Sequence, residues 1–391
     1  MFIGIGLGLN MLRGGSSVDS AFAALAGTNP YMTLDFAGQS YFKQQAQYAL
    51  ASVPGYSFTR ASAGYAQNAT GLLLPFLSGA PRVTDKGVLV EGARTNLLLY
   101  CRDFTNAAWV KTNATAALDQ IGMDGVAASA SSLLATSALA TVLQTIVSAS
   151  TGRATTCYVK RLVGTGTIEF TEDGISYTDI TAQINASTYT RITLTGTILN
   201  PVVGFRITTS GDKIAVDFGQ CESAAFASSP ILTTSASATR AADVLTFSSV
   251  SGAYPWGLYD EFERVVDTGG IEYLATLDAS TNERSHLLID ASDKLNARTV
   301  SGGVTDGAAA TAASVSLGVH KSAGRLQANN VQACLDGTLA TADVATTGPT
   351  APTTFRIGLD ASNGSSPFGY IRRAALFNAA LADARLQALT T

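Results

Sequence analysis

Glu261 and Glu263 form the acidic pair whose spacing best suits acid–base chemistry on a sugar. Side chains two residues apart on a strand point to the same face, and a retaining glycosidase needs two carboxyls about 5 Å apart. In the run Asp260-Glu261-Phe262-Glu263, Phe262 would face the core and Tyr259 would share the acidic face. A solvated acidic face explains the run as well as a cleft does. We therefore expect no enzyme here, with a polysaccharide depolymerase as the alternative.

Sugar binding without catalysis is the second chemistry that the sequence offers. Sugar recognition uses aromatic faces beside Asp and Asn side chains. Tyr254 and Trp256 lie in a predicted loop, and Asp360 and Asn363 lie in a polar turn after a predicted strand. These four residues are the candidate glycan-binding residues. The alternative is structural for both runs, a Trp in the core and an ordinary turn.

Other catalytic patterns are not encoded. His286 and His320 lie far apart without a partner pattern, so neither a histidine-based triad nor a zinc site is expected. The sequence shows no strong signal for a phosphate-binding glycine loop, a nucleophile elbow or a dinucleotide fingerprint. We expect no bound cofactor.

Composition favours a sheet-built protein. The 391 residues allow two or three domains. Only 14% of them are charged, against about 25% in ordinary globular proteins. Low charge with abundant Thr and Val favours pleated sheet. The net charge is −4 and no Lys/Arg cluster is present, so we expect no nucleic-acid partner.

The first 35 residues are predicted to be an attachment arm. Apolar residues alternate with glycines over residues 3–9, which suits a strand or an extended segment that docks elsewhere. The segment lacks the features of a signal peptide and is too short and glycine-rich to cross a bilayer. No membrane partner is expected. A disordered terminus is the alternative.

The rest of the chain divides into three predicted parts. Residues 36–86 carry many turn formers and are interpreted as a loop-rich collar. Residues 87–243 hold short runs rich in β-branched residues, typical of a sandwich. Residues 244–391 repeat that pattern over an ordinary domain length.

The four cysteines, at positions 101, 157, 221 and 334, are expected to be isolated buried thiols. Cys101 and Cys221 fall in the first and last predicted strands of residues 87–243. A bond between them is the alternative.

Several runs resemble known families. Asn96-Leu97-Leu98, Asp103-Phe104 and Trp109 resemble the opening strand of carbohydrate-binding jelly rolls. The longer run Glu91-Gly92-Ala93-Arg94-Thr95-Asn96-Leu97-Leu98 is similar to a family of bacteriophage and gene-transfer-agent fibre or head-spike proteins. Further pieces in matching order are Phe58-Thr59-Arg60-Ala61-Ser62-Ala63, Pro81-Arg82, Gly219-Gln220-Cys221-Glu222, Ser229-Pro230-Ile231 and Thr239-Arg240-Ala241-Ala242-Asp243. Together they cover roughly residues 56–245.

The second sandwich resembles the concanavalin-like, laminin-G-type fold. Residues 331–338 look like its hairpin with an Asp336-Gly337 turn. Phe368-Gly369-Tyr370-Ile371 would lead into its closing strand. Residues 381–389 would form its terminal helix, with Ala382 where Ser usually caps. Such sandwiches often hold calcium. The resemblance therefore allows one structural calcium ion, with Asp278, Asp290 and Asp360 as possible ligands. These residues do not have EF-hand spacing.

These resemblances also decide one ambiguous segment. Apolar residues recur at helical spacing over residues 133–148. The jelly-roll resemblance instead implies a strand at about 141–148, and a strand is our prediction.

The implied fold is all-β, with two β-sandwich (jelly-roll) domains in tandem after an extended N-terminal arm. The implied function is that of a non-enzymatic virion protein, a phage tail fibre or head spike, which is assembled in the host cytoplasm. Its expected partners are other virion proteins, bound through the arm, and host polysaccharide, bound for receptor recognition and adsorption. Fibres of this type are homo-oligomers, often trimers. A structural decoration protein without glycan binding is a further alternative.

Overall fold

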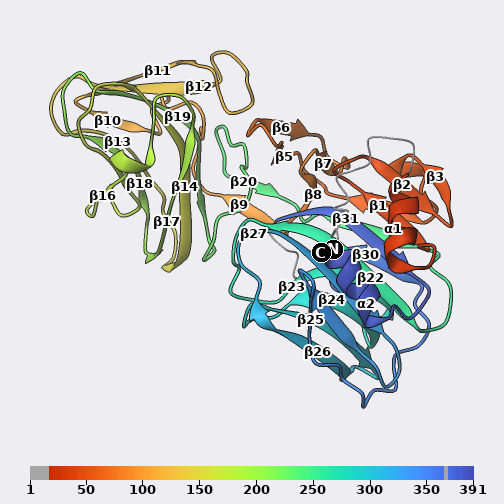
Figure 1. Ribbon diagram of the computed structural model, residues 1–391. Coiled ribbons are helices and arrows are strands. Elements are labelled where there is room, and N and C mark those ends of the chain that lie inside the picture. The colour runs from red at the N-terminus through yellow and green to blue at the C-terminus, as the bar shows by residue number, and fades with distance from the viewer. Residues whose placement is uncertain (1–16, 365–368) are drawn as a thin grey trace, which may run out of the picture. The chain divides into compact units, whose positions relative to one another are not determined.

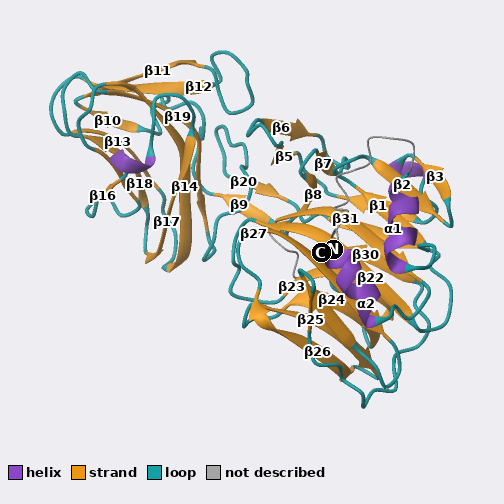
Figure 2. Cartoon of the chain, in the orientation of Figure 1, coloured by secondary structure: helices purple, strands orange, loops and turns teal. Residues whose placement is uncertain are grey.

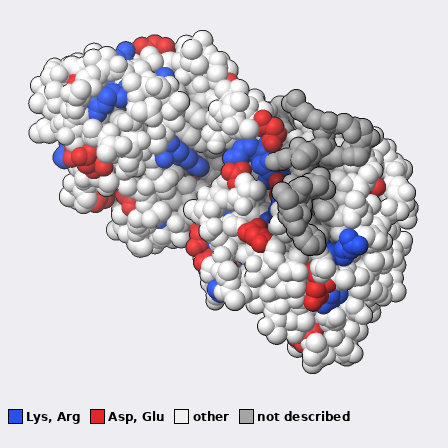
Figure 3. All heavy atoms as spheres, in the orientation of Figure 1, with Lys and Arg blue, Asp and Glu red and all other residues white. Residues whose placement is uncertain are grey.

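The computed structural model describes residues 17–364 and 369–391, which are almost entirely strands and loops (Figures 1 and 2). The described residues contain helices only at Val18–Ala26 (α1), Asp383–Thr390 (α2) and two single 3-10 turns, Leu50–Ser52 and Thr181–Gln183. The all-β prediction is confirmed. Charged side chains are sparse and scattered on the face that Figure 3 shows, as the composition requires.

The chain forms two compact units, and it passes between them four times. Unit 1 comprises residues 1–60, 79–92 and 242–391, and unit 2 comprises residues 61–78 and 93–241. Unit 2 is therefore inserted into unit 1. The domain bounds differ from the predicted ones, because the predicted collar at 36–86 is shared between the units and contributes strands to both.

Unit 1 is a sandwich of two antiparallel sheets. In the described residues, sheet A has ten strands. In spatial order, its path is Thr338–Leu339 (β29), Gln332–Leu335 (β28), Gly318–Leu326 (β27), Trp256–Arg264 (β22), Gly369–Phe377 (β31), Met32–Asp35 (β1), Ser40–Lys43 (β2) and Ala46–Tyr48 (β3); Gly87–Val90 (β8) also pairs with β31, and Arg82–Thr84 (β7) pairs with β8.

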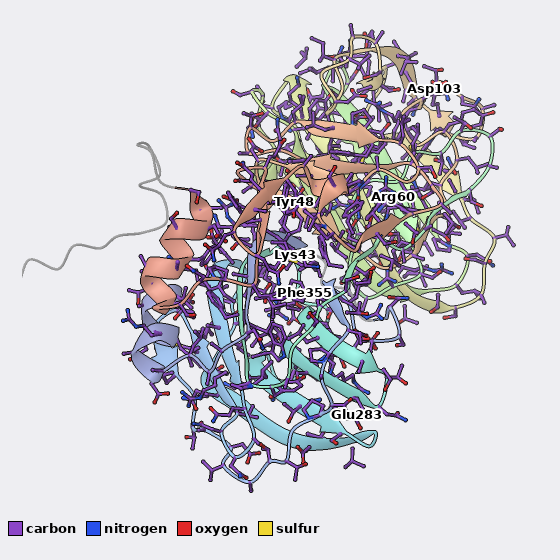
Figure 4. All side chains as sticks on the ribbon, turned by 90° about the vertical axis from the view of Figure 1, so that its right-hand side faces the viewer. Lys43, Tyr48, Arg60, Asp103, Glu283 and Phe355 are labelled. Atoms are coloured by element: carbon purple, nitrogen blue, oxygen red, sulfur yellow. The ribbon has the colours of Figure 1, made fainter. Side chains whose placement is uncertain are left out.

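Sheet B has seven strands in the described residues and faces sheet A across the main core. Its order is Val304–Ser314 (β26), Lys294–Ser301 (β25), Glu283–Ile289 (β24), Glu272–Ser280 (β23), Thr354–Ile357 (β30), Val244–Ser248 (β21) and Tyr56–Thr59 (β4). Alternate residues of these strands, such as Leu277, Leu287 and Phe355, fill the core, so their neighbours point to the opposite side of sheet B. Phe355 lies among packed side chains in Figure 4, whereas Glu283 lies near the margin of unit 1.

The side of sheet A that faces away from sheet B is covered by both helices. Phe22 of α1 and Leu386 of α2 pack with Tyr259 of β22 in one buried cluster, and α1 lies beside α2 in Figure 1. Both faces of β22 are therefore covered, which explains why almost every residue of this strand is buried. The predicted C-terminal helix is confirmed, and Ala382 makes no side-chain cap.

The predicted extended arm at residues 1–35 differs from the described part of this segment. Ser17 caps α1 by accepting a hydrogen bond from the Ser20 amide, and Gly27 ends the helix in the left-handed conformation. Strand β1 then pairs with β31 of sheet A. Residues 17–35 are thus integral to the fold of unit 1. The predicted alternation at residues 3–9 lies outside the described residues.

Unit 2 is a sandwich of two five-stranded sheets among its described residues, as the jelly-roll resemblance predicted. One sheet has the order Val110–Thr112 (β10), Ala140–Thr145 (β13), Val202–Ile207 (β18), Ile168–Thr171 (β15) and Thr178–Asp179 (β16). The other has the order Ala114–Gln120 (β11), Ala130–Ala135 (β12), Lys213–Glu222 (β19), Thr151–Val163 (β14) and Thr190–Ile198 (β17). Two strand pairs complete it, Arg94–Asn96 (β9) with Ala238–Arg240 (β20), and Gly64–Gln67 (β5) with Leu73–Phe76 (β6).

The core of unit 2 contains both aromatic residues of the run that resembles a jelly-roll opening strand. Phe104 and Trp109 are buried, and their rings stack with centroids 4.0 Å apart. The predicted strand near residue 141 is confirmed as β13. The helical spacing misleads because exposed Leu139 lies in a turn with φ +54° between two strands.

Candidate functional site

The structure separates the four predicted glycan-binding residues into two places. Trp256 is fully buried in the core between the sheets. The hydroxyl of Tyr254 lies 2.7 Å from the Ser285 hydroxyl, on the core side of β24. Asp360 and Asn363 lie in the loop after β30 and contact the opposite side of sheet B. Trp256 therefore cannot stack on a sugar. It is a core residue, which was the alternative interpretation.

Polar residues gather on the side of sheet B that faces away from the core, which we call the polar face. Cross-strand register places Arg356 of β30 beside Thr276 of β23, Thr276 beside His286 of β24, and His286 beside Arg298 of β25. Each of these residues adjoins core residues in sequence and so points outward. Arg284, two residues before His286 on β24, lies on the same face.

His286 is a buried member of this face and is held as a neutral ring. The Thr276 hydroxyl donates to the Leu359 carbonyl at 2.7 Å, so its 3.0 Å contact with His286 Nδ1 requires Nδ1 to donate. Nε2 then accepts from Arg284 Nε at 3.1 Å. Burial, followed by the charges of Arg284 and Arg298, lowers the pKa of His286 to about 3. The imidazole therefore carries no charge at neutral pH.

Charge on the polar face is only partly balanced. Asp278 accepts two hydrogen bonds from Arg356, at 2.9 and 3.1 Å, in a bidentate pair. Arg284 and Arg298 make no ion pair with any residue that the structure describes. The Nε of Arg298 is buried and lacks a hydrogen-bond partner among the described residues.

The loop after β30 borders this face. Asp360 accepts hydrogen bonds from the Ser362 and Gly364 amides at 2.9 and 2.7 Å, which closes the turn. Asn363 is exposed, and its Oδ1 accepts from Arg356 Nη1 at 2.7 Å. Its Nδ2 group remains available as a donor, because an amide has separate donor and acceptor ends.

The acidic pair Glu261 and Glu263 lies on sheet A, and both side chains are held in ion pairs. Glu261 accepts from Arg372 at 2.9 Å and from Arg373 at 2.8 Å, and Glu263 pairs with Lys86 at 2.9 Å. Phe262 points into the core between the sheets, as predicted. Both glutamates are therefore partners in separate ion pairs on sheet A.

Four of the runs that resemble fibre proteins, near residues 60, 82, 92 and 241, lie close to the chain crossings, and the runs at 219–222 and 229–231 lie within unit 2. Their polar residues make structural contacts. In unit 1, Arg60 pairs with Asp243 at 2.9 Å, and Arg82 pairs with Glu91 at 2.7 Å and with Asp243. All four side chains are almost fully buried. In unit 2, buried Asn96 donates to the Gly219 and Ile231 carbonyls, each at 3.0 Å. These residues hold the ends of each unit together and are not accessible to a ligand.

Sequence reasoning missed Arg284, His286 and Arg298 as one site. Part of the signal was present, because His286 lies in a predicted strand at residues 285–289, Arg284 directly precedes that strand, and Arg298 lies in the next predicted strand at residues 295–300. A hairpin pairing would have placed them together. His286 was instead set aside because nothing near it in sequence resembles a catalytic partner.

The described residues show no metal centre and no membrane span. They contain no group of three or more His, Cys, Asp or Glu side chains that could hold a metal ion. Asp278 and Asp360 are engaged as above, and Asp290 accepts from the Ser292 amide at 2.8 Å. Within the described part, no helix combines the length and apolar character needed to cross a bilayer.

All four cysteines are free and buried. Cys101 lies against Thr233, and Cys221 accepts from the Thr155 hydroxyl at 3.7 Å. The bond between Cys101 and Cys221, kept open above, is therefore not formed.

Comparisons with known proteins find likeness to parts of β-sandwich proteins. No family model matches the chain, and no curated protein matches it. The CBM40 domain of a Ruminococcus gnavus sialidase is 15% identical, with a TM-score of 0.29 over 35% of this chain and 83% of its own. A Limulus polyphemus pentraxin is 11% identical, with a TM-score of 0.30 over 37% and 73%. Domain 4 of a Geobacillus stearothermophilus arabinanase is 11% identical, with a TM-score of 0.31 over 38% and 73%.

Proposed function

We propose that this protein binds carbohydrate without catalysis and that the polar face of sheet B is the binding surface. The observation that carries the proposal is the set of planar polar groups on this face. Arg284, Arg298 and Asn363 remain accessible beside the hydrogen-bonded His286 and the fixed Arg356–Asp278 pair. Guanidinium and amide groups present several donors in fixed directions, which suits the dense oxygen atoms of a glycan.

The absence of catalysis is part of the proposal. A retaining mechanism needs one carboxyl as nucleophile and another as acid. Glu261 and Glu263 already balance Arg372, Arg373 and Lys86. Oxygens of both carboxylates already pair with these side chains, so we assign neither glutamate a role as acid or nucleophile.

The proposed setting is a virion fibre or head spike of a tailed phage or gene transfer agent. The ordered runs at residues 56–245 support it, because they resemble runs of fibre and spike proteins in both their residues and their order. In this setting unit 1 would adhere to polysaccharide of the host surface and aid adsorption. The partners would be other virion proteins, and the protein would be a homo-oligomer, with a trimer as the first expectation.

Binding of the intact chain to capsular polysaccharide from a susceptible host tests the proposal. We expect binding by biolayer interferometry with no shortening of the polymer on size-exclusion chromatography. Asn363→Asp should weaken binding, because it replaces the Nδ2 donor by a charge yet preserves the acceptor for Arg356. Asn200→Asp is a matched control, since Asn200 is also exposed, has φ 48° and accepts one hydrogen bond through Oδ1. Equal binding by both variants, or a shortened polymer, would contradict the proposal.

A further inference from the structure

Two arginines on adjacent strands of sheet B lack the counter-charge that the other buried or half-buried arginines among the described residues of unit 1 have. Arg284 and Arg298 flank the His286 ring, one along the strand and the other across it. Arg356, on the same face, has Asp278. Arg264, at one end of sheet A, has Glu272, Asp267 and Asp293.

The neighbouring groups do not supply the missing charge. Asp278 is bound to Arg356, and Asp360 is used by the amides of its own turn. Tyr273 lies with its ring 4.8 Å from the His286 ring and is neutral. His286 uses its acceptor nitrogen for Arg284 and is uncharged. With three arginines and two aspartates, the polar face has a net charge of about +1, centred on Arg284 and Arg298.

Such an arrangement favours an anion from outside the chain. Two half-buried guanidiniums repel each other, and a ligand anion between them relieves both the repulsion and the unsatisfied donors. The guanidinium fork matches a planar carboxylate through two parallel hydrogen bonds.

We infer that the polar face binds the carboxylate of an acidic sugar residue between Arg284 and Arg298. This inference rests on the proposed function and narrows its ligand class to polysaccharides that contain uronic or sialic acids. The free donors of Asn363 and the Tyr273 hydroxyl would then serve the sugar hydroxyls.

The aromatic residues support an acidic ligand over a neutral one. Neutral sugars are commonly held by stacking on an exposed ring, whose apolar face suits the sugar ring. Every aromatic side chain among the described residues is at least partly buried. Charge-assisted hydrogen bonds are the stronger contacts that this surface offers.

Binding of the full chain to four polymers tests the inference. The probes are polygalacturonate and polysialic acid, which carry carboxylates, dextran sulfate, which carries sulfates, and uncharged dextran. We expect a carboxylate polymer to bind, with affinity about tenfold or more lower for Arg284→Gln and for Arg298→Gln. Arg298→Lys should lose less, because it preserves the charge and loses only the fork. Arg385→Gln, which removes an exposed arginine from α2, should bind like the wild type.

The outcomes separate the two levels of the proposal. Binding only to dextran, or binding to a carboxylate polymer that both glutamine variants retain, overturns the acidic-sugar inference and leaves carbohydrate binding intact. Stronger binding to dextran sulfate than to either carboxylate polymer also overturns the acidic-sugar inference. Binding to no polymer overturns both the inference and the proposed function.

The melting temperatures of the Arg284 and Arg298 variants should match the wild type within a few degrees, because neither arginine makes an ion pair with a described residue.

Discussion

At the scale of single residues, Asp260 is a buried carboxyl on β22, on the same side of the strand as the core residues Leu258 and Phe262. Neither of its oxygens has a hydrogen-bond partner among the described residues. Burial raises the pKa of Asp260 well above its ordinary value. The folded state therefore holds this side chain protonated, and stability decreases as the pH rises from about 3.9, the unfolded value, towards the folded pKa.

Asp260→Asn should increase the free energy of unfolding at pH 7 and leave it nearly unchanged at pH 4. The amide has a similar shape and does not ionise, so the variant escapes a penalty of about 1.4 kcal/mol per pH unit in that window. Urea unfolding at both pH values measures the difference. A variant that is less stable at pH 7 would show that Asp260 has a partner which stabilises its charge.

His286 gives the opposite pH dependence. Its pKa is lowered to about 3 in the folded state, against about 6.5 in an unfolded chain. The unfolded state thus binds more protons between these values, and stability decreases as the pH falls below about 6.5. His286→Gln should lose less stability than the wild type between pH 6.5 and 5, where the slope is at most about 1.4 kcal/mol per pH unit. Parallel urea titrations would measure this, and equal losses in both proteins would contradict it.

At the scale of elements, local signals were sufficient wherever neighbouring strands are also neighbours in sequence. The Asp336-Gly337 turn joins β28 to β29 with both residues at positive φ, as its sequence requires. The terminal helix, which is also local in sequence, was expected from the resemblance to the concanavalin-like fold. Elements that pair across a long stretch of chain were not predictable. Strand β8 was assigned to the jelly roll, but it pairs with β31 of unit 1, about 280 residues later.

Gly87 is the residue on which that long-range pairing depends. Its φ is +119°, and a Cβ there would lie 2.3 Å from the Ile371 carbonyl oxygen. Gly87→Ala should therefore destabilise unit 1 by about 1–3 kcal/mol, measured by thermal unfolding. Gly270→Ala is the control, because its nearest atom is 3.9 Å away, and it should change stability by less than about 0.5 kcal/mol. Similar effects from both substitutions would mean that β8 contributes little.

The polar face illustrates the same limit for the candidate site. Asp360 and Asn363 were found because a turn motif marks them. The register of β23, β24 and β25 brings Arg284, His286 and Arg298 together. That register cannot be read from a single sequence. Trp256 was predicted to be exposed because a Trp beside a loop can be exposed or buried. It is buried because both faces of β22 are covered.

At the scale of the whole molecule, strands from both ends of the chain build unit 1. Residues 17–60 supply β1 to β4, of which β1 pairs with β31 and β4 pairs with β21. A protease site inserted after exposed Ser78 should therefore be cleaved without separating the two pieces, because strand pairing and the shared core hold them. A single peak on size-exclusion chromatography with two bands on a denaturing gel is the expected result. Separation without denaturant would contradict the assignment of residues 17–60 to unit 1.

The four crossings of the chain also affect how the protein withstands proteolysis. A domain attached by one linker is lost at the first nick, whereas here no single scission frees either sandwich. Both sandwiches should therefore stay associated through early proteolytic damage.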